Sequence, residues 1–149
     1  MHSAVIAILL TLGAASMLHA EQDITGVWQA FDDQTGYSRA DVQISRDSNG
    51  HYNGTIIAIR PLPFKPLVET CEKCKGSLKG TPYVGLQIMT NFKRDPENPS
   101  QYKDGQVLDP LSGKVYKGVA KLNPNGKHLN MRGYVGVSAL GRSTTWIRK

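Results

Sequence analysis

The chain has 149 residues, of which 40% are hydrophobic and 20% charged, and its 18 Lys and Arg residues against 12 Asp and Glu residues give a net charge of +6. This length fits one domain. Nucleic-acid-binding proteins usually concentrate basic residues on one face or helix, whereas here they are spread along the chain, so we expect no nucleic-acid partner. The positive surface serves solubility or attracts an anionic envelope lipid or an acidic ligand.

Residues 1–20 have the features of a secretory signal peptide. Residues 4–18 form an apolar run without a charge, and this run is shorter than the about 20 apolar residues that span a membrane. A small residue, Ala20, stands at the expected cleavage position. We expect cleavage after Ala20, with cleavage after Ala15 or a retained anchor as alternatives. The mature domain, residues 21–149, is then periplasmic or secreted and has no transmembrane segment.

Beyond the signal peptide, apolar and polar residues alternate with period two nearly everywhere, which is typical of half-buried β-strands. Clusters of Gly, Asn, Asp and Pro interrupt the alternation at regular spacing and predict turns. Eight strands at this spacing indicate a β-sandwich or a barrel, and the short sequential hairpins favour an antiparallel up-and-down barrel. Such an interior is filled by side chains or holds one small ligand. The expected strands cover residues 24–31, 40–45, 51–60, 83–92, 101–108 and 114–122, followed by two closing strands within 129–149 that separate near 136–138.

One long segment, residues 60–82, breaks the alternation. It holds four of the eight prolines, both cysteines and several lysines, and we expect one helical turn around Val68 to Lys73. A loop of this length in a compact domain is often functional. We therefore expect an excursion between two strands that contributes to binding or to contact with a partner.

Cys71 and Cys74 form a Cys-x-x-Cys motif inside this excursion. In an oxidising compartment a structural disulfide is the favoured interpretation, and so short a loop would shape the excursion more than it stabilises the fold. A redox site is less favoured because the motif does not open a helix in a βαβ pattern. A metal site would need further ligands, and the mature chain offers only His51 and His128, so we expect neither metal nor cofactor.

The two ends of the mature chain indicate how the barrel closes. Gly26-Val27-Trp28 opens the first strand, and Trp146 and Arg148 lie in the last. First and last strands are neighbours in a closed barrel, where an arginine lies favourably across an indole ring. We therefore expect Arg148 or Arg142 to pack on Trp28. This arrangement resembles the calycin superfamily, which includes the lipocalins and whose barrels open with Gly-x-Trp and close with a basic residue on that Trp.

A closer resemblance covers nearly the whole mature chain. Its motifs are residues 24–28 (ITGVW), 105–110 (GQVLDP) with 113–116 (GKVY), 132–136 (RGYVG) and 140–148 (LGRSTTWIR). In this order they resemble the secreted bacterial family called domain of unknown function 2147. The resemblance implies an exported lipocalin-like barrel with no assigned activity. This chain has Asp104 where that family often has an aromatic residue.

Arginines and aromatic residues of the closing strands are the candidate ligand-binding set. Arg142, Thr144, Trp146 and Arg148 share one face by period two, although either face could point inward. A buried arginine needs a partner, which is an internal carboxylate such as Asp109 or Asp41, or the carboxylate or phosphate of a ligand. The predicted ligand-binding residues are Trp28, Tyr116, Arg132, Tyr134, Arg142 and Trp146, and the predicted structural closure consists of Gly26, Trp28 and Arg148.

No catalytic constellation is present in the sequence. The Gly-x-Ser-x-Gly motif and a Gly-rich phosphate loop are absent, and the histidines flank turns. We expect a non-enzymatic, exported barrel that binds one small amphipathic or anionic ligand, such as a lipid or fatty acid. The alternatives are a protein-interaction or inhibitor module that uses residues 21–25 and the Pro/Cys loop, a barrel with a purely structural interior, and a thiol oxidoreductase that uses Cys71 and Cys74.

Overall fold

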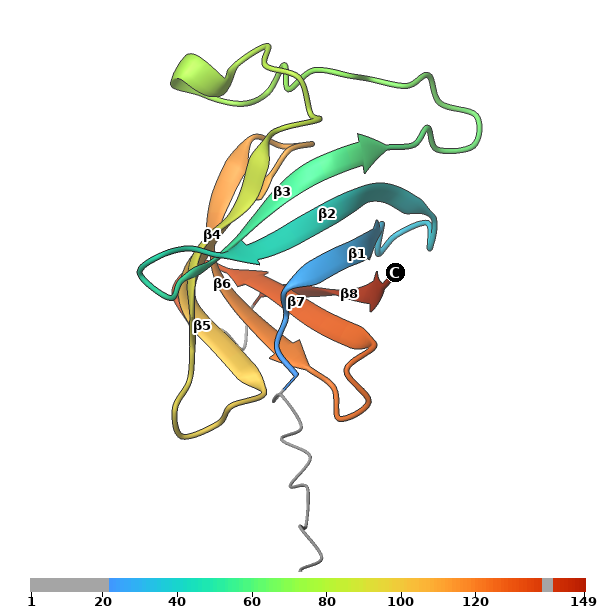
Figure 1. Cartoon of the computed structure of the whole chain (residues 1–149). Coiled ribbons are helices and arrows are strands. Elements are labelled where there is room, and N and C mark those ends of the chain that lie inside the picture. Colours follow the sequence, from blue (N-terminus) through green and yellow to red (C-terminus); the bar gives the residue numbers. More distant parts are fainter. Residues whose placement is uncertain (1–21, 138–140) are drawn as a thin grey trace, which may run out of the picture.

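The structure is a computed structural model that describes residues 22–137 and 141–149. The predicted signal peptide, residues 1–20, its cleavage site after Ala20 and the end of the predicted separation between the closing strands lie outside the described residues. Within them, eight antiparallel strands follow one another around a closed barrel (Figure 1), which confirms the predicted all-β up-and-down topology. None of the described helices is long and apolar enough to cross a membrane. The strands are β1 (Gly26–Phe31), β2 (Ser38–Arg46), β3 (Tyr52–Ile59), β4 (Gln87–Arg94), β5 (Gln101–Asp109), β6 (Lys114–Leu122), β7 (His128–Tyr134) and β8 (Arg142–Arg148).

Because successive strands run in opposite directions, the connections gather at two ends of the barrel. Figure 1 shows the turns after β4 and β6 at the bottom, and we call this the lower end. By alternation of strand direction, the start of β1, the turn after β2 and the end of β8 belong to the same end of the barrel. The upper end carries the connections after β1, β3, β5 and β7, including the long excursion, residues 60–86. The lower turns have the expected chemistry. For example, the Asp47 carboxylate accepts hydrogen bonds from the backbone N–H groups of Asn49 and His51, both at 2.9 Å.

Two predicted elements differ from the structure, both in the excursion. The fourth strand begins at Gln87, not at residue 83, because the Tyr83 N–H donates to Glu69 O within the excursion. The prediction of a helical turn around Val68 to Lys73 is wrong, since Thr70 instead forms a β-bridge with Pro82. The helical turn of the excursion is η1 (Gly76–Leu78). The alternation of residues 83–92 therefore did not mark the start of the strand.

Large side chains fill the lower and middle part of the barrel. Trp28, Tyr52, Phe92 and Tyr102 are each no more than 2% exposed. The Phe92 ring lies against two inward-facing glycines, at which a Cβ atom would approach ring carbons to 2.1 Å at Gly105 and 2.3 Å at Gly118. Glycine is therefore required at both positions by the close approach of the ring.

The disulfide region of the excursion covers part of the outside of the barrel. Met89 pairs with Val107 across β4 and β5, and their neighbours Ile88 and Leu108 have the opposite, outward phase. Ile88 and Leu108 are nevertheless 7% and 8% exposed. They belong to the same apolar cluster as the disulfide-bonded pair Cys71 and Cys74. The predicted disulfide is thus present, and both of its cysteines are buried in this cluster.

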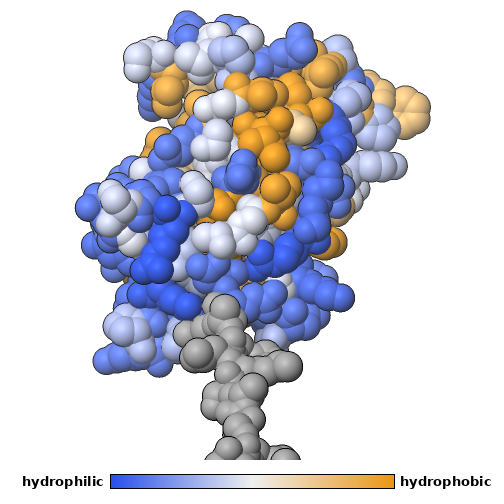
Figure 2. Space-filling view, in the orientation of Figure 1, coloured by the Kyte–Doolittle hydropathy of each residue, from blue (hydrophilic) through white to orange (hydrophobic). Residues whose placement is uncertain are grey.

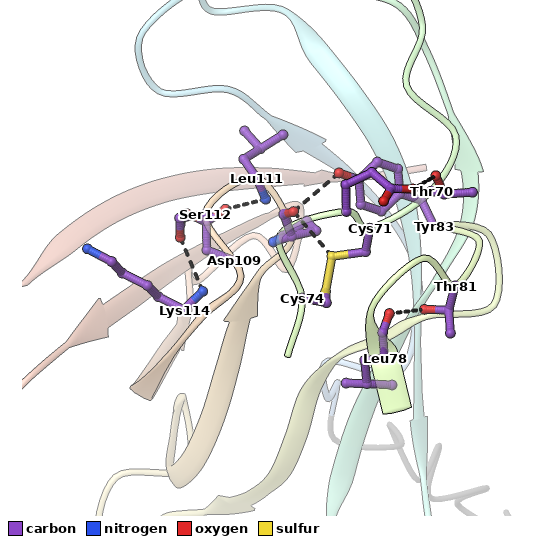
Figure 3. Close-up of a disulfide and its surroundings, with 12 residues drawn as sticks. Thr70, Cys71, Cys74, Leu78, Thr81, Tyr83, Asp109, Leu111, Ser112 and Lys114 are labelled. Atoms are coloured by element: carbon purple, nitrogen blue, oxygen red, sulfur yellow. Dashed lines mark hydrogen bonds between the residues drawn. A yellow bond between two sulfur atoms is a disulfide. The ribbon is translucent and has the colours of Figure 1, made fainter. Parts of the chain in front are cut away.

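The excursion is held in place by the turn between β5 and β6 (Figure 3). The Tyr83 hydroxyl donates to Pro110 O at 3.2 Å, and Cys71 Sγ lies 3.4 Å from the same oxygen. A Cβ atom at Gly113, where φ is 71°, would lie 1.8 Å from Lys73 O. The Asp-Pro-x-x-Gly turn therefore serves as the docking point of the excursion.

Candidate functional site

At the lower end, Arg148 closes the barrel over Trp28. The Arg148 guanidinium carbon lies 4.3 Å from the centroid of the Trp28 ring. The guanidinium also donates to the carbonyl oxygens of Asp23, Thr25 and Gly126, at 2.6, 2.6 and 2.8 Å. Gly26 has a φ of 128°, and a Cβ atom there would lie 3.0 Å from Arg148 Nη1. Burial, partly offset by the nearby Asp23 carboxylate, lowers the pKa of the Arg148 guanidinium from its usual value.

Two tyrosines complete the closure of the lower end. The rings of Tyr52 and Tyr102 meet edge to face, with centroids 4.9 Å apart. Arg46 lies over the Tyr52 ring at 5.8 Å and Arg94 over the Tyr102 ring at 5.7 Å. The Tyr52 hydroxyl donates to the Asp23 carboxylate at 3.2 Å. Burial raises the pKa of Tyr102 to about 12. This end of the barrel is sealed by aromatic rings and arginines.

At the upper end the inward-facing side chains are smaller and partly exposed. Inward positions follow from the register, in which Ala30 pairs with Ala40 and Val107 with Tyr116. The interior is therefore filled by large buried side chains below, and its upper inner surface is only partly buried. We call the upper inner surface the mouth, and it consists of Ala30, Ala40, Ile59, Val107, Tyr116, Gly133 and Thr144, all of intermediate exposure.

The seam between β1 and β8 changes character along its length. The two strands pair in register from Trp28 to Ala30, and below this the Lys149 N–H donates to Val27 O at 3.0 Å. Above this, Thr144 Oγ1 donates to Phe31 O at 2.8 Å, and the Arg142 guanidinium makes a bidentate contact with the Asp33 carboxylate, at 2.7 and 2.6 Å. An open groove of about 370 Å³ lies beside this upper seam. Its lining includes Phe31, Asp33, Gly36, Ser143 and Thr145.

Arg142 lies at the rim of the mouth, not inside the barrel. Its side chain is 68% exposed, and the adjacent Asp33 carboxylate raises the pKa of its guanidinium. The expectation that Asp109 or Asp41 partners an interior arginine of β8 is wrong. The Asp109 carboxylate accepts hydrogen bonds within its own turn, from the Leu111 N–H at 3.0 Å and the Ser112 hydroxyl at 2.7 Å.

Asp41 instead joins three distant parts of the chain. Its carboxylate, on the outer side of β2, contacts Arg60 at the start of the excursion at 2.6 Å and Lys149 at 2.8 Å. Burial alone would raise the pKa of Asp41, but the hydrogen bonds from Arg60 and Lys149 hold it below its usual value. This network is structural and does not face the mouth.

Two of the predicted ligand-binding residues lie on the outside of the barrel. Leu129 and Met131 of β7 belong to the buried core, so Arg132 and Tyr134 take the opposite phase. The Arg132 guanidinium donates to the Ser143 hydroxyl at 2.7 Å on this outer surface, and Tyr134 pairs in register with the exposed Lys117. The structure therefore corrects the expectation that Arg132 and Tyr134 line the interior.

The other predicted residues divide between the floor and the mouth. Trp28 is fully buried beneath Arg148 and belongs to the closing layer. Trp146, which is 4% exposed, pairs in register with Ala30 and so lies beside the mouth, at the level of Ala30. Tyr116 lies in the mouth itself. The sequence thus placed Tyr116 and Trp146 at or beside the candidate site and missed its alanines. Small residues at inward positions were the signal that would have revealed them.

Metal and redox chemistry find little support among the described residues. No group of three His, Cys, Asp or Glu side chains there is placed to hold a metal ion. His128 Nδ1 lies 3.1 Å from the Asn123 side-chain amide, in a turn. Cys71 and Cys74 are 0% and 3% exposed, which restricts the access that thiol–disulfide exchange needs.

A second open hollow, of about 270 Å³, lies on the outer surface of β6 to β8 and is lined in part by Lys121, His128 and Asn130.

Comparisons with known proteins agree with this geometry. The family described as "Uncharacterized protein conserved in bacteria (DUF2147)" matches residues 26–148. No curated protein sequence matches the chain. A solved structure described as "Protein HP1028 from the human pathogen Helicobacter pylori belongs to the lipocalin family" superposes with a TM-score of 0.71 and 18% sequence identity, covering 87% of this chain and 84% of that one. The similarity shows that the two proteins share a fold.

Proposed function

Because the chain belongs to the DUF2147 family of bacterial proteins and folds as a lipocalin-like barrel, we propose that it binds one small amphipathic ligand in the mouth, without catalysing a reaction. The observation that carries the proposal is the change in size along the interior. Inward-facing aromatic rings fill the lower part, whereas alanine, glycine and threonine share the upper inner surface with Ile59, Val107 and Tyr116, and all of these are partly exposed. A barrel stabilised only by its own packing has no need of small, partly exposed residues on its inner surface.

The chemistry of the mouth defines the class of ligand. Ala30, Ala40 and Val107 offer apolar surface, which favours a hydrocarbon chain or ring. Tyr116 and Thr144 add hydroxyl groups at the same level. At the rim, the Arg142 guanidinium already holds Asp33 through two short contacts. An anionic head group at the rim therefore competes with Asp33 for Arg142, and most of the binding energy comes from the apolar part.

The proposal includes the compartment. An apolar run at residues 4–18 that ends before Ala20 supports export, and a disulfide between Cys71 and Cys74 supports an oxidising environment. In a bacterium these conditions are met in the cell envelope. The ligand class that fits both the mouth and this location is a lipid or a fatty acid.

A fluorescent fatty acid tests the proposal directly. The mature protein should raise the fluorescence of the probe saturably, and unlabelled fatty acid should displace it. Ala40→Phe places a ring in the mouth and should weaken binding at least tenfold, because the added ring occupies the apolar space. Gln43→Phe is the matched control, since it adds the same ring to the exposed outer side of the same strand.

Two outcomes would contradict the proposal. The first is no saturable binding by the wild-type protein, together with no co-purifying amphiphile in native mass spectrometry of protein from its own host. The second is equal loss of binding in Ala40→Phe and Gln43→Phe. Circular dichroism establishes that each variant is folded. If Ala40→Phe does not fold, Ala30→Leu tests the same surface with a smaller side chain.

A further inference from the structure

Exposed apolar side chains gather at the upper end of the barrel. Figure 2 shows apolar surface over the upper half of this face, whereas the lower half is hydrophilic. Almost all exposed large apolar residues of the described chain belong to the upper connections or to strand ends beside them. They include Phe64, Leu67 and Val68 in the excursion, Leu111 in the turn after β5, and Val135 and Val137 after β7.

Phe64 is the most unusual of these residues. Its side chain is completely exposed, with a relative accessibility of 106%. Its φ is 63°, in the left-handed region that bulky residues avoid. The Lys65 N–H bonds to Leu62 O at 3.3 Å, so Pro63 and Phe64 are the central residues of a turn with Pro first and a positive φ second, where glycine is usual. Neither the exposed ring nor the backbone conformation stabilises the isolated fold, which points to a contact outside the molecule.

The excursion that carries Phe64 is basic. Residues 60–82 contain five cationic residues and two glutamates, which gives this segment a net charge of +3 (5 − 2). Lys65 follows Phe64 directly, and Lys75 and Lys79 flank η1. These three lysines are exposed. An exposed aromatic tip beside Lys65, in an excursion whose other exposed lysines lie around η1, complements a surface that has negative charge outside and hydrocarbon beneath it.

We propose that the upper end of the barrel docks on a bilayer that contains anionic lipid, with Phe64 inserted among the acyl chains and the lysines at the head groups. The apolar tips stand on separate loops and do not form one flat face. A fluid bilayer accommodates apolar side chains on several separate loops, whereas a folded protein partner would need a surface of complementary shape. The inference concerns the outside of the upper loops and goes beyond the proposed ligand site in the mouth.

Co-sedimentation with vesicles tests the inference. The mature protein should bind vesicles of phosphatidylglycerol and phosphatidylethanolamine and should not bind vesicles of phosphatidylcholine alone. Phe64→Ser should weaken this binding at least tenfold, because the inserted ring is lost. Ile147→Ser is the matched control, since Ile147 is an exposed apolar residue, 38% accessible, on β8 towards the lower end. This control should bind vesicles as the wild type does.

A second variant tests insertion independently of sedimentation. Phe64→Trp should retain vesicle binding, and brominated acyl chains should quench its emission more than that of the wild type, whose tryptophans are both buried. Equal binding to phosphatidylcholine vesicles, undiminished binding of Phe64→Ser, or an unquenched Phe64→Trp would each overturn the inference. Fluorescent fatty-acid binding by Phe64→Ser should be unchanged, which separates this inference from the proposed function.

Discussion

The guanidinium carbon of Arg148 lies 4.3 Å from the centroid of the Trp28 ring and joins the last strand of the barrel to the first. The same group holds the segment before β1 and the turn after β6 through their carbonyl oxygens. One side chain thus connects both termini of the sheet with a neighbouring hairpin. Closure of the barrel depends on this arginine more than on any other single contact at the lower end.

Replacement of Arg148 by Ala should therefore destabilise the protein strongly. It removes a cation–π contact and three charge-assisted hydrogen bonds, which together predict a loss of about 3 kcal/mol in the free energy of unfolding. Urea unfolding followed by tryptophan fluorescence measures the change. Arg142→Ala on the same strand is the control and should cost less than about 1 kcal/mol, because its pair with Asp33 is exposed. Equal losses in the two variants would contradict the assigned closure.

Asp41→Asn should remove part of the pH dependence of stability. The folded-state pKa of Asp41 is lowered by Arg60 and Lys149, so its contribution is fully present above the unfolded pKa of about 4 and is lost as the pH falls through the lower folded value. At pH 7 the variant should be less stable by about 1–3 kcal/mol. The difference between the two proteins should shrink steadily as the pH falls below about 4. A difference that stays constant down to pH 2 would show that the charge of Asp41 is not its source.

Gly118→Ala should destabilise the barrel by about 1–3 kcal/mol, because the new methyl group meets the Phe92 ring. Phe92→Leu alone should also be destabilising, since it leaves space over both glycines. In the double variant the two losses should not add, because the smaller side chain makes room for the methyl group. Thermal unfolding of the three variants measures the coupling. Simple additivity would mean that the ring is not the obstacle.

Replacement of Cys71 and Cys74 together by Ser should loosen the excursion more than the barrel. A loop this short contributes about 2 kcal/mol in the chain-entropy description. The local effect is larger, because both cysteines are buried and Cys71 Sγ lies 3.4 Å from Pro110 O in the turn on which the excursion docks. Hydrogen exchange should accelerate at the Cys71 and Tyr83 amides, which donate within the excursion, and should change little in β1 and β8. Uniform acceleration over all strands would instead assign the disulfide a global role.

The sequence was sufficient to predict the barrel and its closure, because both depend on local patterns. Alternation defines the strands, short turns order them, and a closed meander brings Trp28 next to the end of the chain. The position of the excursion was not predictable, because it depends on contacts distant in sequence, such as Gly113 against Lys73. Arg132 and Tyr134 were placed inside on account of their chemistry, although counting phase from Leu129 and Met131 places them outside. No sequence signal indicated that Phe64 would be fully exposed.

The lower and upper halves of the β1–β8 seam are held by different interactions, and only those of the upper half depend strongly on ionic strength. Below, backbone pairing and the half-buried Arg148 fix the circumference of the barrel. Above, the strands are joined by the Thr144 hydroxyl and by the exposed pair of Arg142 and Asp33, and such pairs weaken as ionic strength rises. Stiffness therefore decreases along the barrel axis. Widening of the upper circumference would break one solvated ion pair and one side-chain hydrogen bond, whereas widening below would break backbone pairing between the strands.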